Sequence, residues 1–197
     1  MRKSIVFVSI AIIVVGMLAG LRLFASEEPY DGSGSDDGEQ SVGKAKALME
    51  MEHESDDRVE QLRGEIEAGR LSEADCQIEI EDMVRAIFDN LSRMEEGTGS
   101  YLNLAYNCNV IRKLGLGLED RQDMADAELE LKRDNLTRFA DKVFNYSLDV
   151  SAKTEEKADY MQLSEWAAEI EENLDQEIGR YTDLLYAWYK EKGKNKQ

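Results

Sequence analysis

An uninterrupted apolar segment near the start of the chain, Ser4 to Leu21, constrains this protein more than any other feature. A helix that crosses a bilayer core of about 30 Å needs roughly 20 apolar residues, and the segment reaches that length when it is extended to Phe24. No later segment of the sequence is comparable. We therefore expect residues 1–26 to fasten the chain to a membrane, with the rest of the protein working on one side of it.

This segment is either a retained anchor or a cleaved signal. A cleavable signal has an apolar core of about 7–15 residues and small residues before the cut. Here the core is longer, and a cut after Ala25 places the bulky Leu23 where a small residue is preferred, which favours the retained anchor. Because Arg2 and Lys3 precede the segment and acidic residues follow Arg22, the positive-inside rule predicts a cytoplasmic N-terminus. The body is then extracytoplasmic, and periplasmic in a Gram-negative cell.

Gly16 and Gly20 form a G-x-x-x-G pair inside the apolar segment. Two glycines one turn apart allow a second membrane helix to approach closely. The pair predicts a site of membrane-helix packing, with a chance occurrence as the alternative, because small residues are common in such helices and one pair is a weak motif.

Acidic residues dominate the chain, with 42 Asp and Glu against 24 Lys and Arg and a net charge of −18. Because Arg2, Lys3 and Arg22 precede the first acidic residue, the part from Glu27 onward carries −21, three units below the whole chain. Nucleic-acid binding needs a basic surface that neutralises phosphates, so this class is excluded. Such a body is also disfavoured on anionic lipid. The charge is compatible with a basic protein partner, with divalent cations or simply with solubility, and a solvated acidic surface is the commonest explanation.

Three regions follow the apolar segment. Residues 27–43 are rich in Gly, Ser and acidic residues, so we expect a disordered linker there. Residues 44–192 contain no proline and are expected to form one helical domain, followed by a basic tail at 193–197. The prediction is an all-α protein with a single N-terminal membrane helix, a flexible acidic linker and an antiparallel helical bundle with coiled-coil-like seams.

Hydrophobic periodicity predicts five helices in the bundle. We expect them at about 44–68, from the N-cap Ser72 to the turn at Gly97, at 101–114, at 119–149 and at 153–191. The third is expected to end where Gly115 and Gly117 interrupt it. The second helix has a heptad-like stripe of Ile80, Val84, Ile87, Leu91 and Met94. The last helix has the strongest stripe, made of Leu163, Ala167, Ile170, Leu174, Ile178, Tyr181, Leu185 and Trp188.

Cys76 and Cys108 are the two cysteines, and an extracytoplasmic location would allow them to pair. If their helices form a hairpin that turns near Thr98, the two residues lie at heights that differ by roughly 18 Å. Bridged Cα atoms lie within about 7 Å of each other, so this geometry argues against an intramolecular disulfide. A bridge would require a kink or another helix order, and the alternatives are free buried thiols or intermolecular disulfides.

The sequence shows no constellation of residues that predicts catalysis, a metal site or a cofactor. His53 is the only histidine, and with Glu50 it forms an E-x-x-H unit whose second copy, needed for a di-iron site, cannot exist in one chain. The order Met49, Met51, His53 contains ligands that copper accepts, but a solvent-facing helix turn is the simpler interpretation. We therefore predict a protein that is not an enzyme.

Aromatic residues crowd the end of the last predicted helix and cover more than one of its faces. The cluster comprises Tyr181, Leu184, Leu185, Tyr186, Trp188 and Tyr189. Exposed Tyr and Trp are favoured at protein interfaces, so Tyr186, Trp188 and Tyr189 are predicted to bind a partner, unless a neighbouring helix buries both sides.

Together these features predict a membrane-anchored extracytoplasmic adaptor or scaffold that acts through protein–protein contacts, with another protein or with itself. The alternative is an extracytoplasmic helical module that binds a ligand and signals through a partner.

Overall fold

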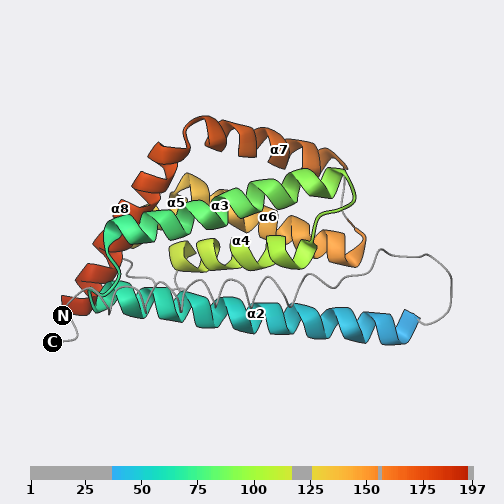
Figure 1. Ribbon diagram of the computed structural model, residues 1–197, viewed down its shortest axis with the longest axis horizontal. Coiled ribbons are helices and arrows are strands. Elements are labelled where there is room, and N and C mark those ends of the chain that lie inside the picture. Colours follow the sequence, from blue (N-terminus) through green and yellow to red (C-terminus); the bar gives the residue numbers. More distant parts are fainter. Residues whose placement is uncertain (1–36, 117–125, 155–156, 195–197) are drawn as a thin grey trace, which may run out of the picture. The chain divides into compact units, whose positions relative to one another are not determined.

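The computed structural model describes residues 37–116, 126–154 and 157–194, and the chain from Glu39 onward forms one compact unit. Regular structure in these residues is helical throughout, which confirms the predicted all-α class (Figure 1). The helices are α2 (Asp37–Glu67), α3 (Glu73–Glu95), α4 (Tyr101–Leu116), α5 (Asp126–Arg133), α6 (Asn135–Ala152), α7 (Lys157–Glu172) and α8 (Leu174–Lys194). None of these described helices has the length and apolar character that a membrane crossing requires.

Several predictions fall outside the described residues. They concern the membrane segment 1–26, with Gly16 and Gly20, and the first part of the linker. Helix α2 begins at Asp37, earlier than the predicted start at Lys44, so the last residues of the predicted linker are helical. The first residues of the predicted basic tail belong to α8, which ends at Lys194.

Helix α4 lies at the centre of the bundle, where it packs against α3, α5 and α6. A helix that is apolar on most of its faces belongs inside a protein, and α4 follows that rule. Its buried residues are Leu102, Leu104, Ala105, Cys108, Asn109, Val110, Ile111, Leu114 and Gly115. Gly115 therefore does not interrupt the helix as predicted. An added Cβ there would clash with Thr137 of α6, so the glycine allows the two helices to approach closely.

The predicted apolar stripes coincide largely with the core. In α3 the stripe residues Ile80, Val84, Ile87 and Leu91 are buried, and only Met94 at its end is half-buried. All eight residues of the predicted stripe in 153–191 are buried as well. Helix periodicity thus identified the core-facing sides correctly, because the repeat of 3.6 residues is a local property of the chain.

Two of the predicted long helices are broken, and the single-helix predictions for 119–149 and 153–191 are wrong. Asp134 interrupts the first, because its backbone is extended and its side chain accepts a hydrogen bond from the Leu136 N–H at 2.9 Å, which caps α6. Asn173 interrupts the second, and its carbonyl accepts the N–H groups of Gln176 and Glu177 at 3.0 Å as α8 begins. Both are residue types that compete with helical hydrogen bonds through their side chains.

Candidate functional site

The aromatic cluster at the end of α8 does not form the exposed interface that the sequence predicted. Tyr186 and Trp188 are each 5% exposed, and Tyr189 is fully buried. The prediction assumed that part of the cluster faces solvent, and the structure contradicts this assumption. The neighbouring elements cover both sides of α8, which was the alternative interpretation of the same residues.

The tyrosine hydroxyls of this cluster bind backbone carbonyls from distant parts of the chain. Tyr181 donates to the Ile111 carbonyl at 2.7 Å, and Tyr189 donates to the Leu114 carbonyl at 3.1 Å. Leu114 lies in the last turn of α4, where carbonyls lack an intrahelical partner, so Tyr189 satisfies a group that the helix cannot. Tyr186 donates to the carbonyl of Leu71, between α2 and α3, at 2.7 Å.

Both cysteines are free and buried. Burial, and to a smaller extent the nearby carboxylates of Glu79 and Glu73, raise the pKa of the Cys76 thiol to about 12. Burial also raises the pKa of Cys108 well above its ordinary value. Because the thiolate is the reactive form, neither cysteine has the environment of a nucleophile at neutral pH.

A largely buried ion pair joins α2 to α3 near Cys76. Arg58 donates to the Glu79 carboxylate, and the two side chains are 19% and 11% exposed. Burial raises the pKa of Glu79 although Arg58 acts in the opposite direction. A pair of this kind positions the two helices, and removing one partner would leave a buried charge without compensation.

A second polar connection joins α2, α4 and α6. Asn109 donates to the Ser55 hydroxyl at 2.6 Å, and Arg112 donates to the Asn109 side-chain oxygen at 2.8 Å. Arg112 also forms an ion pair with Asp141, with Nη1 and Oδ1 3.3 Å apart. The central carbon of its guanidinium lies 3.9 Å from the centroid of the Phe144 ring. Each polar group has a partner inside the protein, so the network orders the three helices and presents no group to a ligand.

The residues of the Met-x-Met-x-His pattern do not converge. Met49 is 71% exposed, whereas Met51 is buried, so the two thioethers face opposite sides of α2. His53 is exposed, and its Nε2 lies 3.8 Å from Oδ2 of Asp57. Within the described ranges, no group of three or more His, Cys, Asp or Glu side chains is arranged as metal ligands.

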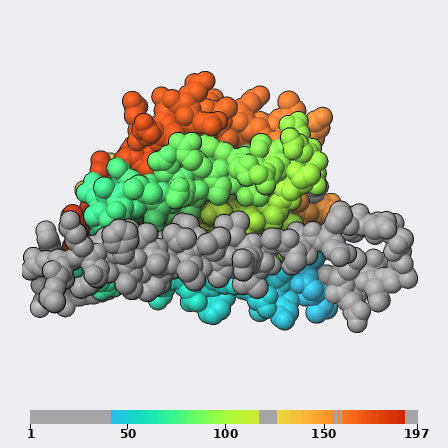
Figure 2. All heavy atoms as spheres, in the orientation of Figure 1, coloured from blue at the N-terminus to red at the C-terminus, as the bar shows by residue number. Residues whose placement is uncertain are grey.

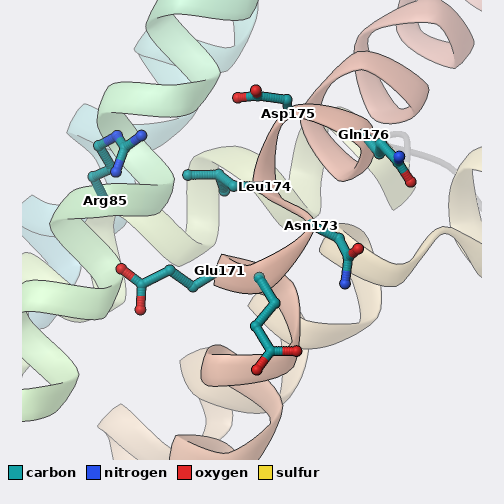
Figure 3. A pocket seen from close by; sticks show the side chains of 7 residues that line it. Arg85, Glu171, Asn173, Leu174, Asp175 and Gln176 are labelled. Atoms are coloured by element: carbon teal, nitrogen blue, oxygen red, sulfur yellow. The ribbon is translucent and has the colours of Figure 1, made fainter.

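An acidic hollow lies beside the break between α7 and α8 (Figure 3). Its lining residues are Arg85, Glu171, Glu172, Asn173, Leu174, Asp175 and Gln176. Figure 3 shows the Glu171 and Asp175 side chains pointing toward the side of α3, which carries Arg85, whereas Asn173 points away from it. Arg85 pairs with Glu81 of its own helix at 2.7 Å. Among the described residues, the carboxylates of the hollow are not arranged as the ligands of one metal ion.

Sequence reasoning missed this hollow. Paired acids such as Glu171 and Glu172 are so frequent in the chain that a solvated face was the natural interpretation. The signal that would have located the hollow is the break at Asn173, because the break brings the end of α7 and the start of α8 to one elbow.

Comparison of the chain with known protein families, curated proteins and solved structures finds no match.

Proposed function

We propose that this protein is a membrane-anchored helical adaptor whose extracytoplasmic body binds a basic segment of another protein at the acidic hollow. In this proposal the N-terminal segment is the anchor, the acidic linker separates the body from the membrane, and the body is an antiparallel bundle with coiled-coil-like seams. The apolar run from Ser4 to Leu21 and the charges that flank it support the anchor and its orientation.

The observation that carries the choice of surface is the local excess of carboxylates at the elbow. Glu171, Glu172 and Asp175 are exposed, and none of them has an ion pair with another described residue. Arg85, the cation among the described lining residues, is already engaged by Glu81. A basic partner would be steered toward such a surface, and its Lys or Arg side chains would complement the uncompensated charges.

The buried state of the aromatic cluster supports the same choice. The residues predicted to bind a partner are occupied by contacts within the chain, so they contribute to stability. Exposed large apolar side chains among the described residues are Val42, Met49, Ile78 and Met161, which are scattered over three helices. Single apolar residues of this kind are normal on a protein surface, and charge is the more distinctive feature.

The test is the co-purification of a partner from native membranes through a C-terminal tag, in mild detergent and at two salt concentrations. We expect a stoichiometric companion with a basic surface, and we expect high salt to release it because exposed charges are screened. The triple variant Glu171→Gln, Glu172→Gln, Asp175→Asn is expected to lose the companion at low salt.

The matched control removes three exposed carboxylates elsewhere, by Glu54→Gln, Glu60→Gln and Asp82→Asn. The control variant has the same net charge as the triple variant, so it separates a local site from an effect of overall charge. Equal loss of the companion from both variants, or retention by both, would contradict the proposed site. A wild-type chain that purifies without any companion would contradict the adaptor function itself.

A further inference from the structure

Helix α7 is attached to the bundle between two interruptions of the helical backbone. Before it, Lys153 ends α6 in the left-handed conformation with φ of 56°. After it, Asn173 separates it from α8. In the face shown in Figure 2, α7 lies beside α3, and it also contacts α6 and α8. A helix bounded in this way can rotate at its ends without bending any other helix.

The apolar contacts of α7 are few and concentrated on one stripe. Among the side chains of α7 that the structure describes, the buried ones are Leu163, Ala167 and Ile170, and Trp166 is half-buried. The Trp166 ring lies edge-on to Phe139 of α6, with ring centroids 5.6 Å apart. Phe139 in turn lies edge-on to Phe88 of α3, at 6.0 Å. Helix α7 therefore covers an aromatic surface made by α3 and α6.

A polar latch centred on Asn135 holds both sides of the Asn173 break. The Asn135 side-chain oxygen accepts a hydrogen bond from the Trp166 indole N–H at 3.1 Å, which connects α6 to α7. Its amide nitrogen donates to Glu177 of α8, also at 3.1 Å. One side chain thus connects the helices on either side of the elbow.

Buried polar atoms without a hydrogen-bond partner lie at the N-cap of α6, in α7 and in α8. The atoms are Asp134 Oδ2, Ser164 Oγ and Glu177 Oε2, and none accepts or donates a hydrogen bond within the described part of the chain. Asp134 Oδ2 forms an ion pair with Arg180, whose Nε lies at 3.4 Å. A buried polar atom without a partner favours any state in which water reaches it, so these atoms lower the cost of opening the elbow.

We propose that α7 is a hinged flap, which opens about Asn173 while α3, α4 and α6 stay folded and exposes the Phe88–Phe139 surface. Few apolar contacts, one polar latch and the unsatisfied hydroxyl of Ser164 distinguish α7 from the central helix α4. Local opening of such a segment occurs at a lower free energy than global unfolding. The flap is therefore a conformational device of the fold, independent of any bound partner.

Native-state hydrogen exchange of the full-length chain in detergent tests this proposal. We expect the amides of α7 to exchange at least about 100-fold faster than those of α4, because only α7 opens locally. Ser164→Ala removes one unsatisfied hydroxyl from the closed state and should slow α7 exchange about fivefold. Trp166→Phe keeps an aromatic ring but removes the N–H of the latch, and should accelerate α7 exchange about fivefold.

Ser92→Ala is the matched control, because Ser92 is an exposed serine of α3 and its hydroxyl already donates to the Asp89 carbonyl of its own helix. It should leave α7 exchange unchanged, and neither flap variant should change the exchange of α4. Equal protection of α7 and α4 in the wild-type chain would overturn the proposal. So would a Ser164→Ala variant that slows α7 and α4 by the same factor, because this result would mean that the two helices unfold together.

Discussion

The two ends of helix α8 bury apolar side chains to a similar extent but treat buried polar groups differently. In the part of α8 from Tyr181 onward, which we call the tyrosine end, the hydroxyls of Tyr181, Tyr186 and Tyr189 each donate to a backbone carbonyl. At the elbow near Asn173, Ser164 Oγ and Glu177 Oε2 have no hydrogen-bond partner among the described residues. Burial alone does not distinguish these ends, whereas hydrogen bonding does.

This difference predicts which part of the protein can open locally while the rest of the bundle stays folded. A satisfied buried hydrogen bond contributes about 1 kcal/mol, whereas an unsatisfied buried polar atom costs about 1–3 kcal/mol. The tyrosine end should therefore unfold only with the whole bundle, and the elbow should open first. The predictions that follow test this contrast in order of decreasing effect.

Truncation of a tyrosine should distinguish the two ends most strongly. Tyr181→Ala removes a fully buried ring and leaves the Ile111 carbonyl without the hydroxyl, so we expect a loss of about 3–5 kcal/mol in the free energy of unfolding. Tyr160→Ala on α7 removes a half-buried ring and should cost clearly less. Urea denaturation monitored by circular dichroism measures both. A Tyr160 variant that is as unstable as the Tyr181 variant would remove the contrast.

Addition of one methyl group at Gly115 should disturb the end of α4 to which Tyr181 and Tyr189 bind. The new Cβ would clash with Thr137, so Gly115→Ala should lower the free energy of unfolding by about 1–3 kcal/mol. Gly64→Ala in α2 is the matched control, because nothing lies near the new Cβ and alanine favours the helix by about 1 kcal/mol. In thermal melts we expect a lower melting temperature for Gly115→Ala and a higher one for Gly64→Ala. A stabilising effect of Gly115→Ala would mean that α4 and α6 are not in close contact there.

Removal of a single hydroxyl should have opposite effects at the two ends. Tyr189→Phe keeps the ring but leaves the Leu114 carbonyl unsatisfied, so it should destabilise the protein by about 1–2 kcal/mol. Ser164→Ala removes a hydroxyl that already lacks a partner, so it should stabilise the protein by up to about 1 kcal/mol. The midpoints of denaturant-induced unfolding measure both effects, provided that the slopes of the transitions are the same in the variants and the wild-type chain. If both variants were destabilised, the elbow would be as well satisfied as the tyrosine end.

The smallest effect concerns the pH dependence that Asp134 gives to the elbow. Burial raises the pKa of Asp134 above its ordinary value of 3.8, and the Leu136 N–H and Arg180 oppose this shift only in part. The folded state therefore binds the proton more tightly than the unfolded state. Its contribution to stability is greatest below pH 3.8 and is lost as the pH rises through the raised pKa.

Asp134→Asn removes this titration but keeps an oxygen that can cap α6. Its stability relative to the wild-type chain should be greatest at neutral pH and should decrease as the pH falls toward 4. The pKa of Glu79 is also raised by burial, but Glu79 is present in both proteins and cancels in the difference. Thermal melts of the two proteins between pH 4 and 7 make the test. A difference that grows on acidification would show that ion pairing with Arg180 dominates over burial.

Much of the fold was accessible from the sequence, whereas the candidate site was not. The N-cap Ser72 was predicted, and its side chain accepts the Asp75 N–H at 3.1 Å. The expected end of the first helix near residue 68 is also confirmed, because α2 ends at Glu67 and Gly69 adopts a φ of 64°. Caps and stops of this kind depend on a few neighbouring residues, so local patterns identify them. The break at Asp134 was not predicted, although aspartate is a common N-cap residue, because residues 119–149 were interpreted as one long helix.

The sequence by itself determined the helical class, the core-facing stripes and the acidic character of the body, because propensity, periodicity and charge are local properties of the chain. Only the tertiary structure decided that Gly115 lies inside a helix, that Tyr189 is core and that the acids beside Asn173 share one hollow. These outcomes depend on which helices become neighbours in space. Burial and hydrogen bonding between distant segments are set by that packing, and no window of sequence contains both partners.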